Sequence, residues 1–185
     1  TVLEDGTVEI TDYIGDDTEL VIPEEIDGKI VTVIGENAFA FCETLIEIRI
    51  PDSVEVIDDH GFWGCFNLAS VTIPDSVMEI GNNAFDTCER LINATIGKGV
   101  RTIGEMPFCN CISLKSISVD IENTAYSSDE SGALFDKNKT TLIAYPAGNE
   151  NTAHLIFSND PNEDYSGTFT PDNPGKPVGK TPEKK

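Results

Sequence analysis

Apolar residues recur along this chain with a fixed spacing of 23 residues. Four columns keep that spacing without a slip: Ile34, Ile57, Ile80 and Ile103; Phe39, Phe62, Phe85 and Phe108; Cys42, Cys65, Cys88 and Cys111; and Leu45, Leu68, Leu91 and Leu114. A unit of this size cannot bury its own apolar side, so neighbouring units must stack and share one continuous core. The pattern therefore predicts a solenoid.

Each unit ends in a short stretch of period-two alternation, as in Leu45-x-x-Ile48-x-Ile50, which predicts a short strand. Strands about 4.8 Å apart in successive coils would form a parallel sheet along one side. The crossover rule makes the coil right-handed. The outward strand positions, which we take as candidate partner-binding residues, are Glu47, Arg49, Ser70, Thr72, Asn93, Thr95, Ser116 and Ser118.

The return path of each coil carries an Ala-Phe-x-x-Cys segment. Its i, i+3 spacing predicts a helical or 3₁₀ turn. Glycine follows the column isoleucine at Gly35, Gly81 and Gly104, which suggests a tight turn with positive φ. Asp58 replaces that glycine in the second coil, so we expect local strain there.

Both ends of the stack need a cover because a solenoid exposes its core at each terminus. Near the N-terminus, Asp5-Gly6 and Asp27-Gly28 are hairpin-turn signals between apolar residues. Near the other end, Leu134-Phe135 and Leu142-Ile143 bracket a polar turn over 136–139. We expect hairpin caps at both ends.

The pattern Ile-Gly-x-x-Ala-Phe-x-x-Cys-x-x-Leu-x-x-Ile-x-Ile-Pro-x-Ser-Val resembles the BspA-like leucine-rich repeat, a family of bacterial and some protist surface proteins. Residues 20–33 look like the opening unit of that family, and residues 132–148 look like its hairpin. The resemblance implies a leucine-rich repeat solenoid. For function it implies an extracellular module, secreted or anchored to the cell surface through a region outside this chain.

The chain divides into four predicted parts. Residues 1–33 form an N-terminal cap and opening repeat, 34–125 four repeats, 126–157 a C-terminal capping hairpin, and 158–185 a Pro/Lys-rich linker or tail. The last part has too few apolar residues to offset its ordering entropy, so an extended segment is favoured. The alternative is a tail docked along the body through Tyr165 and Phe169.

Charge and hydropathy exclude two classes of partner. With 33 acidic and 12 basic residues, the formal charge of −21 would repel a phosphate backbone, so we expect no nucleic acid. The chain has no apolar run near the roughly 18 residues that a membrane span needs. We expect a monomer that inserts into no membrane.

Catalytic and metal-binding motifs are weak. The two histidines, His60 and His154, fall in no nucleophile motif, and Gly97-x-Gly99 lacks the third glycine of a phosphate loop. Acidic clusters lack the ligand alternation of an EF-hand, and Cys109-Asn110-Cys111 has no second ligand pair. We therefore predict a non-enzymatic protein without metal or cofactor.

The cysteine count is odd, at five. Four cysteines share the inward column, which favours free, buried thiols that pack as small apolar groups. Cys109 stands instead in a variable column with Ala40, Trp63 and Asp86. It is either a reactive surface thiol or a half-buried inert one.

Two functions remain from different classes. The first is an adhesin-like binding module that recognises a protein, or a glycan, of a host or neighbouring cell; the second is a spacer or stalk in a larger surface protein or secreted enzyme. A second candidate surface is an exposed aromatic patch of His60, Trp63 and Phe66. Its alternative is structural packing of Trp63 and Phe66 on their own coil, or against Phe41 and Ile112.

Overall fold

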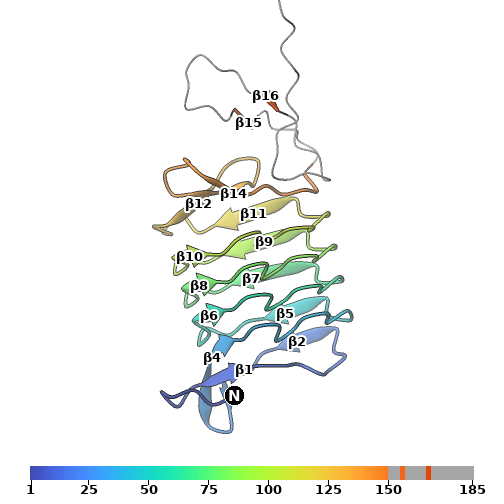
Figure 1. Cartoon of the computed structure of the whole chain (residues 1–185), viewed down its shortest axis with the longest axis vertical. Helices are drawn as coiled ribbons and strands as arrows, with labels where there is room; N and C mark the ends of the chain where they lie inside the picture. The colour runs from blue at the N-terminus through green and yellow to red at the C-terminus, as the bar shows by residue number, and fades with distance from the viewer. Residues whose placement is uncertain (150–154, 157–165, 168–185) are drawn as a thin grey trace, which may run out of the picture.

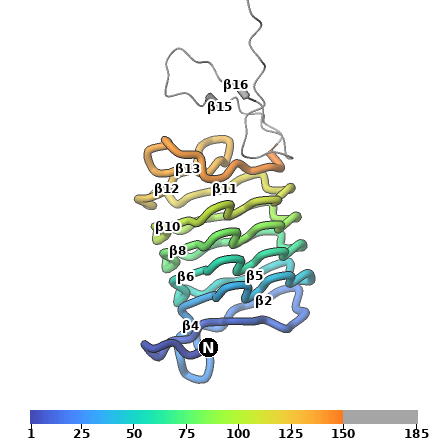
Figure 2. Tube along the Cα trace, viewed as in Figure 1, coloured from blue at the N-terminus to red at the C-terminus, as the bar shows by residue number. Residues whose placement is uncertain are grey.

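The computed structural model describes residues 1–149 and the backbone of two paired strands, β15 (Leu155–Ile156) and β16 (Ser166–Gly167). His154 lies outside the described residues. So does most of the predicted tail at 158–185, including Tyr165 and Phe169. Within residues 1–149 the chain winds into coils stacked along one axis, which confirms the predicted solenoid (Figures 1 and 2).

The predicted parallel sheet runs along one side of the stack. Its order is β11-β9-β7-β5-β2, and its strands are β2 (Glu19–Val21), β5 (Glu47–Arg49), β7 (Ser70–Ile73), β9 (Asn93–Ile96) and β11 (Ser116–Val119). Residues 23 positions apart are partners, as in Ser70 with Asn93 and Asn93 with Ser116. The sequence period is therefore the strand register.

A second parallel sheet, which the sequence analysis did not predict, closes the other side. Its order is β1-β4-β6-β8-β10, with β3 paired to β4. The strands are β1 (Val8–Ile10), β3 (Glu25–Ile26), β4 (Lys29–Ile34), β6 (Val56–Ile57), β8 (Glu79–Ile80) and β10 (Thr102–Ile103). The strands β6, β8 and β10 are only two residues long, and each ends on a column isoleucine.

The return path contains no helix anywhere in residues 1–149, so the predicted helical or 3₁₀ turn is wrong. Backbone amides there alternate between two partners. The amide of Ala38 donates within its own turn to the carbonyl of Gly35 (3.1 Å), whereas the amide of Phe39 donates to Gly61 of the next coil (2.8 Å). Residues four apart take a left-handed φ, as at Asn37 (59°) and Phe41 (58°), which a helix cannot contain.

The recurring glycines have a different cause from the predicted positive φ, which Gly35, Gly81 and Gly104 do not adopt. A Cβ at Gly81 would lie 2.4 Å from the backbone nitrogen of Asp59, on the preceding coil. At Gly81, and likewise at Gly104, two coils therefore approach too closely for a Cβ, whereas the second coil accommodates the Cβ of Asp58 in the same column. Asp58 also has no left-handed φ, and its amide donates to Ile34 as usual (2.8 Å), so the expected backbone strain is absent.

The core consists of the predicted columns stacked on themselves. The phenylalanine rings lie 5.1–5.4 Å apart and nearly parallel, and Tyr13 covers the first ring, Phe39, at 5.3 Å. The leucine column is fully buried. Each of these contacts joins neighbouring coils, so the coils stabilise one another.

The four column cysteines are free and buried. The Cys65 thiol donates to the carbonyl of Phe39 on the preceding coil (3.1 Å), and Cys88 and Cys111 repeat the bond at 3.3 and 3.1 Å. The neighbouring thiols of Cys111 and Cys65, together with burial, raise the pKa of Cys88 well above its ordinary value. Cys88 therefore stays protonated, and the three thiol-to-carbonyl bonds join each coil to the preceding one.

Hairpins cap both ends, as predicted. At the N-terminal end Val2 bridges Val8 across the Asp5-Gly6 turn, and β3 pairs with β4 through Asp27-Gly28, both with positive φ. At the other end an antiparallel sheet of β12 (Tyr126–Ser128), β13 (Leu134–Asp136) and β14 (Leu142–Ala144) follows the last coil. Leu134 of this cap is fully buried, so the cap covers the core.

Candidate binding surfaces

The outward side of β5, β7, β9 and β11, called here the strand face, holds the eight residues that the alternation singled out. Their neighbours in sequence, such as Val71, Ala94 and Ile117, point into the core, which turns the intervening side chains outward. Seven of the eight are exposed and Ser116 is half-buried. Within residues 1–149, none of the eight side chains makes a hydrogen bond or an ion pair.

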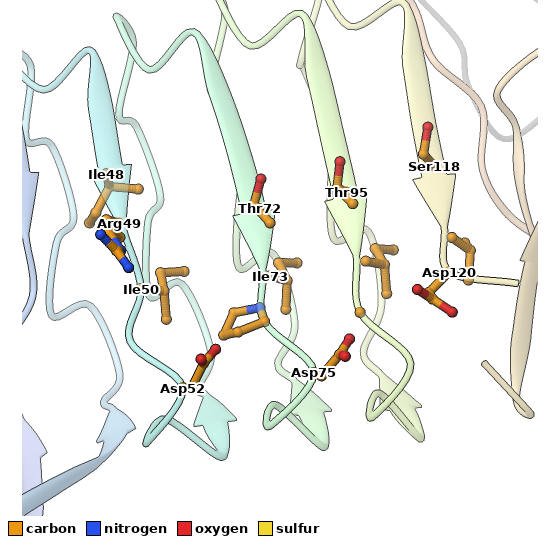
Figure 3. Close-up of a pocket in the computed structure, with 14 residues that line it drawn as sticks. Ile48, Arg49, Ile50, Asp52, Thr72, Ile73, Asp75, Thr95, Ser118 and Asp120 are labelled. Atoms are coloured by element: carbon orange, nitrogen blue, oxygen red, sulfur yellow. The ribbon is translucent and has the colours of Figure 1, made fainter. Parts of the chain in front are cut away.

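A shallow groove of about 620 Å³ crosses the strand face where the strands end. Figure 3 shows Thr72, Thr95 and Ser118 in one row on successive strands. The carboxylates of Asp52, Asp75 and Asp120 lie just after the ends of β5, β7 and β11. Isoleucine side chains line the space between, as at Ile73. The groove thus pairs a row of hydroxyl groups with an acidic border over an apolar floor.

Arg49 and Lys98 are the basic groups of this region. Arg49 lines the groove from β5 and has no ion-pair partner among the described residues. Lys98 lies outside the groove lining, with its Nζ 2.9 Å from Glu122 and 3.9 Å from Asp75. Both of these pairs are exposed, so they add little to stability.

The second candidate surface is an aromatic cluster of Phe41, His60, Trp63 and Phe66. The ring centroids of Trp63 and Phe41 are 4.5 Å apart, those of Phe66 and Phe41 6.2 Å, and those of His60 and Trp63 5.5 Å. The structure therefore brings together the three predicted aromatic residues and adds Phe41, named beforehand only as a packing partner. Trp63 and Phe66 pack against Phe41 and are half-buried, whereas Phe41 itself is 49% exposed.

The described residues give little support to a reactive thiol, a metal site or a membrane-crossing helix. Cys109 is half-buried, and burial together with the negative charge of Asp86 raises the pKa of its thiol, which lowers its reactivity. Among the described residues, no group of three or more His, Cys, Asp or Glu side chains could hold a metal ion. The same part of the chain contains no helix of the length and apolarity that a membrane crossing needs.

Stacked 23-residue coils with a parallel sheet along one side define a leucine-rich repeat protein. The family model of the BspA type leucine rich repeat region matches residues 18–162 in six copies, and the chain belongs to this family. The match begins before the four uninterrupted units of the sequence pattern and extends beyond them. No curated protein matches the chain.

Solved structures of bacterial leucine-rich repeat proteins are similar to this chain. The protein TpLRR of T. pallidum is 27% identical over 63% of this chain and 66% of its own, with a TM-score of 0.53. A protein from Bacteroides capillosus is 28% identical over 64% of this chain and 91% of its own, with a TM-score of 0.59. One from Bacteroides ovatus is 39% identical over 57% of this chain, which spans only 25% of that protein, with a TM-score of 0.48.

Proposed function

We propose that this chain is a non-enzymatic, extracellular binding module that presents its strand face to a protein partner on a host or neighbouring cell. The observation that carries the proposal is the unused hydrogen-bonding capacity of the strand face. Seven exposed side chains and the half-buried Ser116 project from a rigid sheet without intramolecular partners in residues 1–149. A spacer would gain nothing from keeping such a surface free of internal bonds.

Rigidity makes this surface suited to binding. The backbone of the strand face is fixed by inter-strand hydrogen bonds and by a fully buried core. Binding of a partner would therefore cost little backbone conformational entropy. Small hydroxyl and amide groups lose little side-chain entropy when they form hydrogen bonds. A protein partner fits better than a compact glycan because the donors and acceptors extend across four strands.

The family supports the remaining parts of the proposal. Proteins built from interchangeable leucine-rich coils generally serve as scaffolds for recognition, which supports a role without catalysis. The repeat of this chain resembles that of a family of bacterial surface proteins, which supports a location outside the cell. Function on such a scaffold belongs to the outward positions, because the inward ones are committed to packing.

The proposal is tested by binding of the whole chain to immobilised extracellular-matrix proteins and mucins. The triple variant Thr72→Ala, Thr95→Ala, Ser118→Ala should weaken the strongest interaction by at least about tenfold, since three net hydrogen bonds of about 0.5 to 1.5 kcal/mol each are removed. Glu79→Gln with Thr102→Ala, exposed on the other sheet, is the control and should leave affinity unchanged. Equal affinity of both variants would refute the strand face as the site, and no binding by the wild type would favour a spacer.

A further inference from the structure

The aromatic cluster interrupts the repeat at one place. Two successive coils supply its rings: Phe41 comes from the first, and His60, Trp63 and Phe66 come from the second. In the third coil the positions of Trp63 and Phe66 hold Asp86 and Glu89. The cluster is therefore no requirement of the coil, since the third coil folds without it.

Phe41 occupies a backbone conformation that disfavours it. Its φ is 58°, and the same column holds Gly64 (69°), Thr87 (59°) and Asn110 (54°). A left-handed φ is uncommon for residues other than glycine, asparagine and aspartate, and it is costly for a bulky side chain. Every coil has a left-handed φ at this position, so the conformation belongs to the coil, but Phe41 alone places an aromatic ring there. Because Phe41 is also 49% exposed, burial does little to offset the cost of that conformation.

The ring of Phe41 packs against the backbone of Gly64. A Cβ at Gly64 would lie 2.7 Å from the Cδ1 atom of Phe41, so the ring rests directly against the backbone of the next coil. Trp63 and Phe66 stand on either side of Gly64 in the sequence, and both contact the same ring. The three rings thus form one partly exposed apolar surface, which is supported by the backbone at Gly64.

Carboxylates border the rings on both sides. Glu43 and Glu89 occupy the column of Phe66 on the coils before and after it, and both are exposed. Neither carboxylate makes a hydrogen bond or an ion pair within residues 1–149. The faces of aromatic rings carry partial negative charge, so rings and carboxylates together attract a cation.

We propose that the aromatic cluster, with Glu43 and Glu89, binds arginine side chains of a basic protein segment. A planar guanidinium group can stack on Trp63 or Phe41 while its N–H groups donate to a carboxylate, which an ammonium group cannot do equally well. The net charge of −21 would speed the approach of such a segment. This surface is separate from the strand face and does not depend on the function proposed for it.

Trp63 is the single tryptophan of the chain, so its fluorescence reports on this surface alone. The probe is a blocked octapeptide of alternating arginine and glycine, compared with matched lysine and glutamate peptides. We expect a saturable change of Trp63 emission with the arginine peptide, weaker binding of the lysine peptide, and none of the glutamate peptide.

Two variants separate the rings from the charges. Phe41→Asn removes a ring while keeping a residue that tolerates the left-handed φ, as Asn110 does in the same column. Glu43→Gln with Glu89→Gln removes two exposed charges and no packing. Each should weaken the arginine peptide about fivefold, with the melting temperature unchanged or raised for Phe41→Asn. The triple alanine variant of the strand face should bind the peptide like the wild type.

Three outcomes would overturn the proposal. The first is the absence of a saturable emission change with the arginine peptide. The second is equal binding of the arginine and lysine peptides that Phe41→Asn does not weaken, which is diffuse attraction to an acidic chain. The third is full binding by the double glutamine variant, which folds whatever the fate of Phe41→Asn.

Discussion

Single side chains affect the stability of this stack most where they join two coils. The hydroxyl of Ser76 donates to the carbonyl of Val54 on the preceding coil (2.7 Å). Ser53 stands one coil earlier in the same column, and its buried hydroxyl has no partner within the described residues. The same residue type thus has opposite energetic consequences at two equivalent positions.

The pair gives a matched prediction. Ser76→Ala should lower the free energy of unfolding by about 1 kcal/mol because an inter-coil hydrogen bond is lost. Ser53→Ala should be neutral or stabilising because it removes a hydroxyl that is buried and unsatisfied. Urea unfolding of both variants measures the difference, and equal losses would contradict this assignment.

The reactivity of the individual thiols tests whether the column cysteines are free and buried. In the native protein at most Cys109 should react with a thiol reagent, and slowly, because burial and the Asp86 charge raise its pKa. After denaturation all five thiols should titrate. Fewer than five would reveal disulfides, which the packing of the column does not provide for.

At the scale of elements, the C-terminal cap is fastened by one buried side chain. The Nδ2 group of Asn123 donates to the carbonyls of Gly97 (2.9 Å) and Val100 (3.1 Å). Its Oδ1 accepts from the amides of Ala125 and Tyr126, each at 2.8 Å. Asn123 therefore joins the third and fourth coils to the first strand of the cap.

Replacing this residue should loosen the whole cap. Asn123→Ala should cost about 2 to 4 kcal/mol, because four backbone groups lose a partner at a buried site. Asn138→Ala, in the exposed turn between β13 and β14, is the control and should cost less than about 0.5 kcal/mol. Thermal melting compares the two, and a small loss for Asn123→Ala would mean that apolar packing alone holds the cap.

Elements also show how far the sequence could predict the fold. Strands β5, β7, β9 and β11 were predictable because alternation is a local signal, and the hairpins because Asp-Gly turns are. Strands β6, β8 and β10, at two residues each, are too short to alternate. The helical spacing misled because every second amide of the return path bonds to the next coil, a partner that no single repeat reveals.

The two candidate surfaces also differ in whether local sequence or a contact between coils reveals them. The strand face was predictable from alternation alone, because inward leucines and isoleucines fix the opposite positions. The aromatic cluster was predictable only in part, since joining Phe41 to Trp63 requires the contact across coils. Gly64 between Trp63 and Phe66 was the signal available in the sequence, because a glycine there leaves room for a neighbouring ring.

For the whole molecule, acidity gives stability a defined pH dependence. Hydrogen bonds from the side chain and the backbone amide of Asn82 lower the pKa of Asp59. Hydrogen bonds from the Thr141 amide and the Thr140 hydroxyl lower the pKa of Asp136. Because these pKa values are depressed on folding, their contribution is complete above the ordinary value of about 3.8 and is lost as pH falls through the folded values. Repulsion from the net charge of −21 opposes folding at neutral pH.

Melting should therefore respond to salt and acid in opposite ways. At pH 7, raising the salt from low to about 0.15 M should raise the melting temperature, since screening weakens repulsion between exposed charges. Below about pH 4 the melting temperature should fall, and Asp59→Asn should make that fall shallower. A melting temperature independent of both variables would contradict the charge account.

We propose that binding resides on the strand face while folding resides in the inward columns. Thr95 and Thr102 test it as a pair, because both are exposed threonines on parallel strands, one on each sheet. The measurement is the affinity of Thr95→Arg and Thr102→Arg for the strongest matrix-protein or mucin partner of the wild type. Thr95→Arg should abolish binding and Thr102→Arg should preserve it, with both variants melting within a few degrees of the wild type; equal binding by the two would contradict the account.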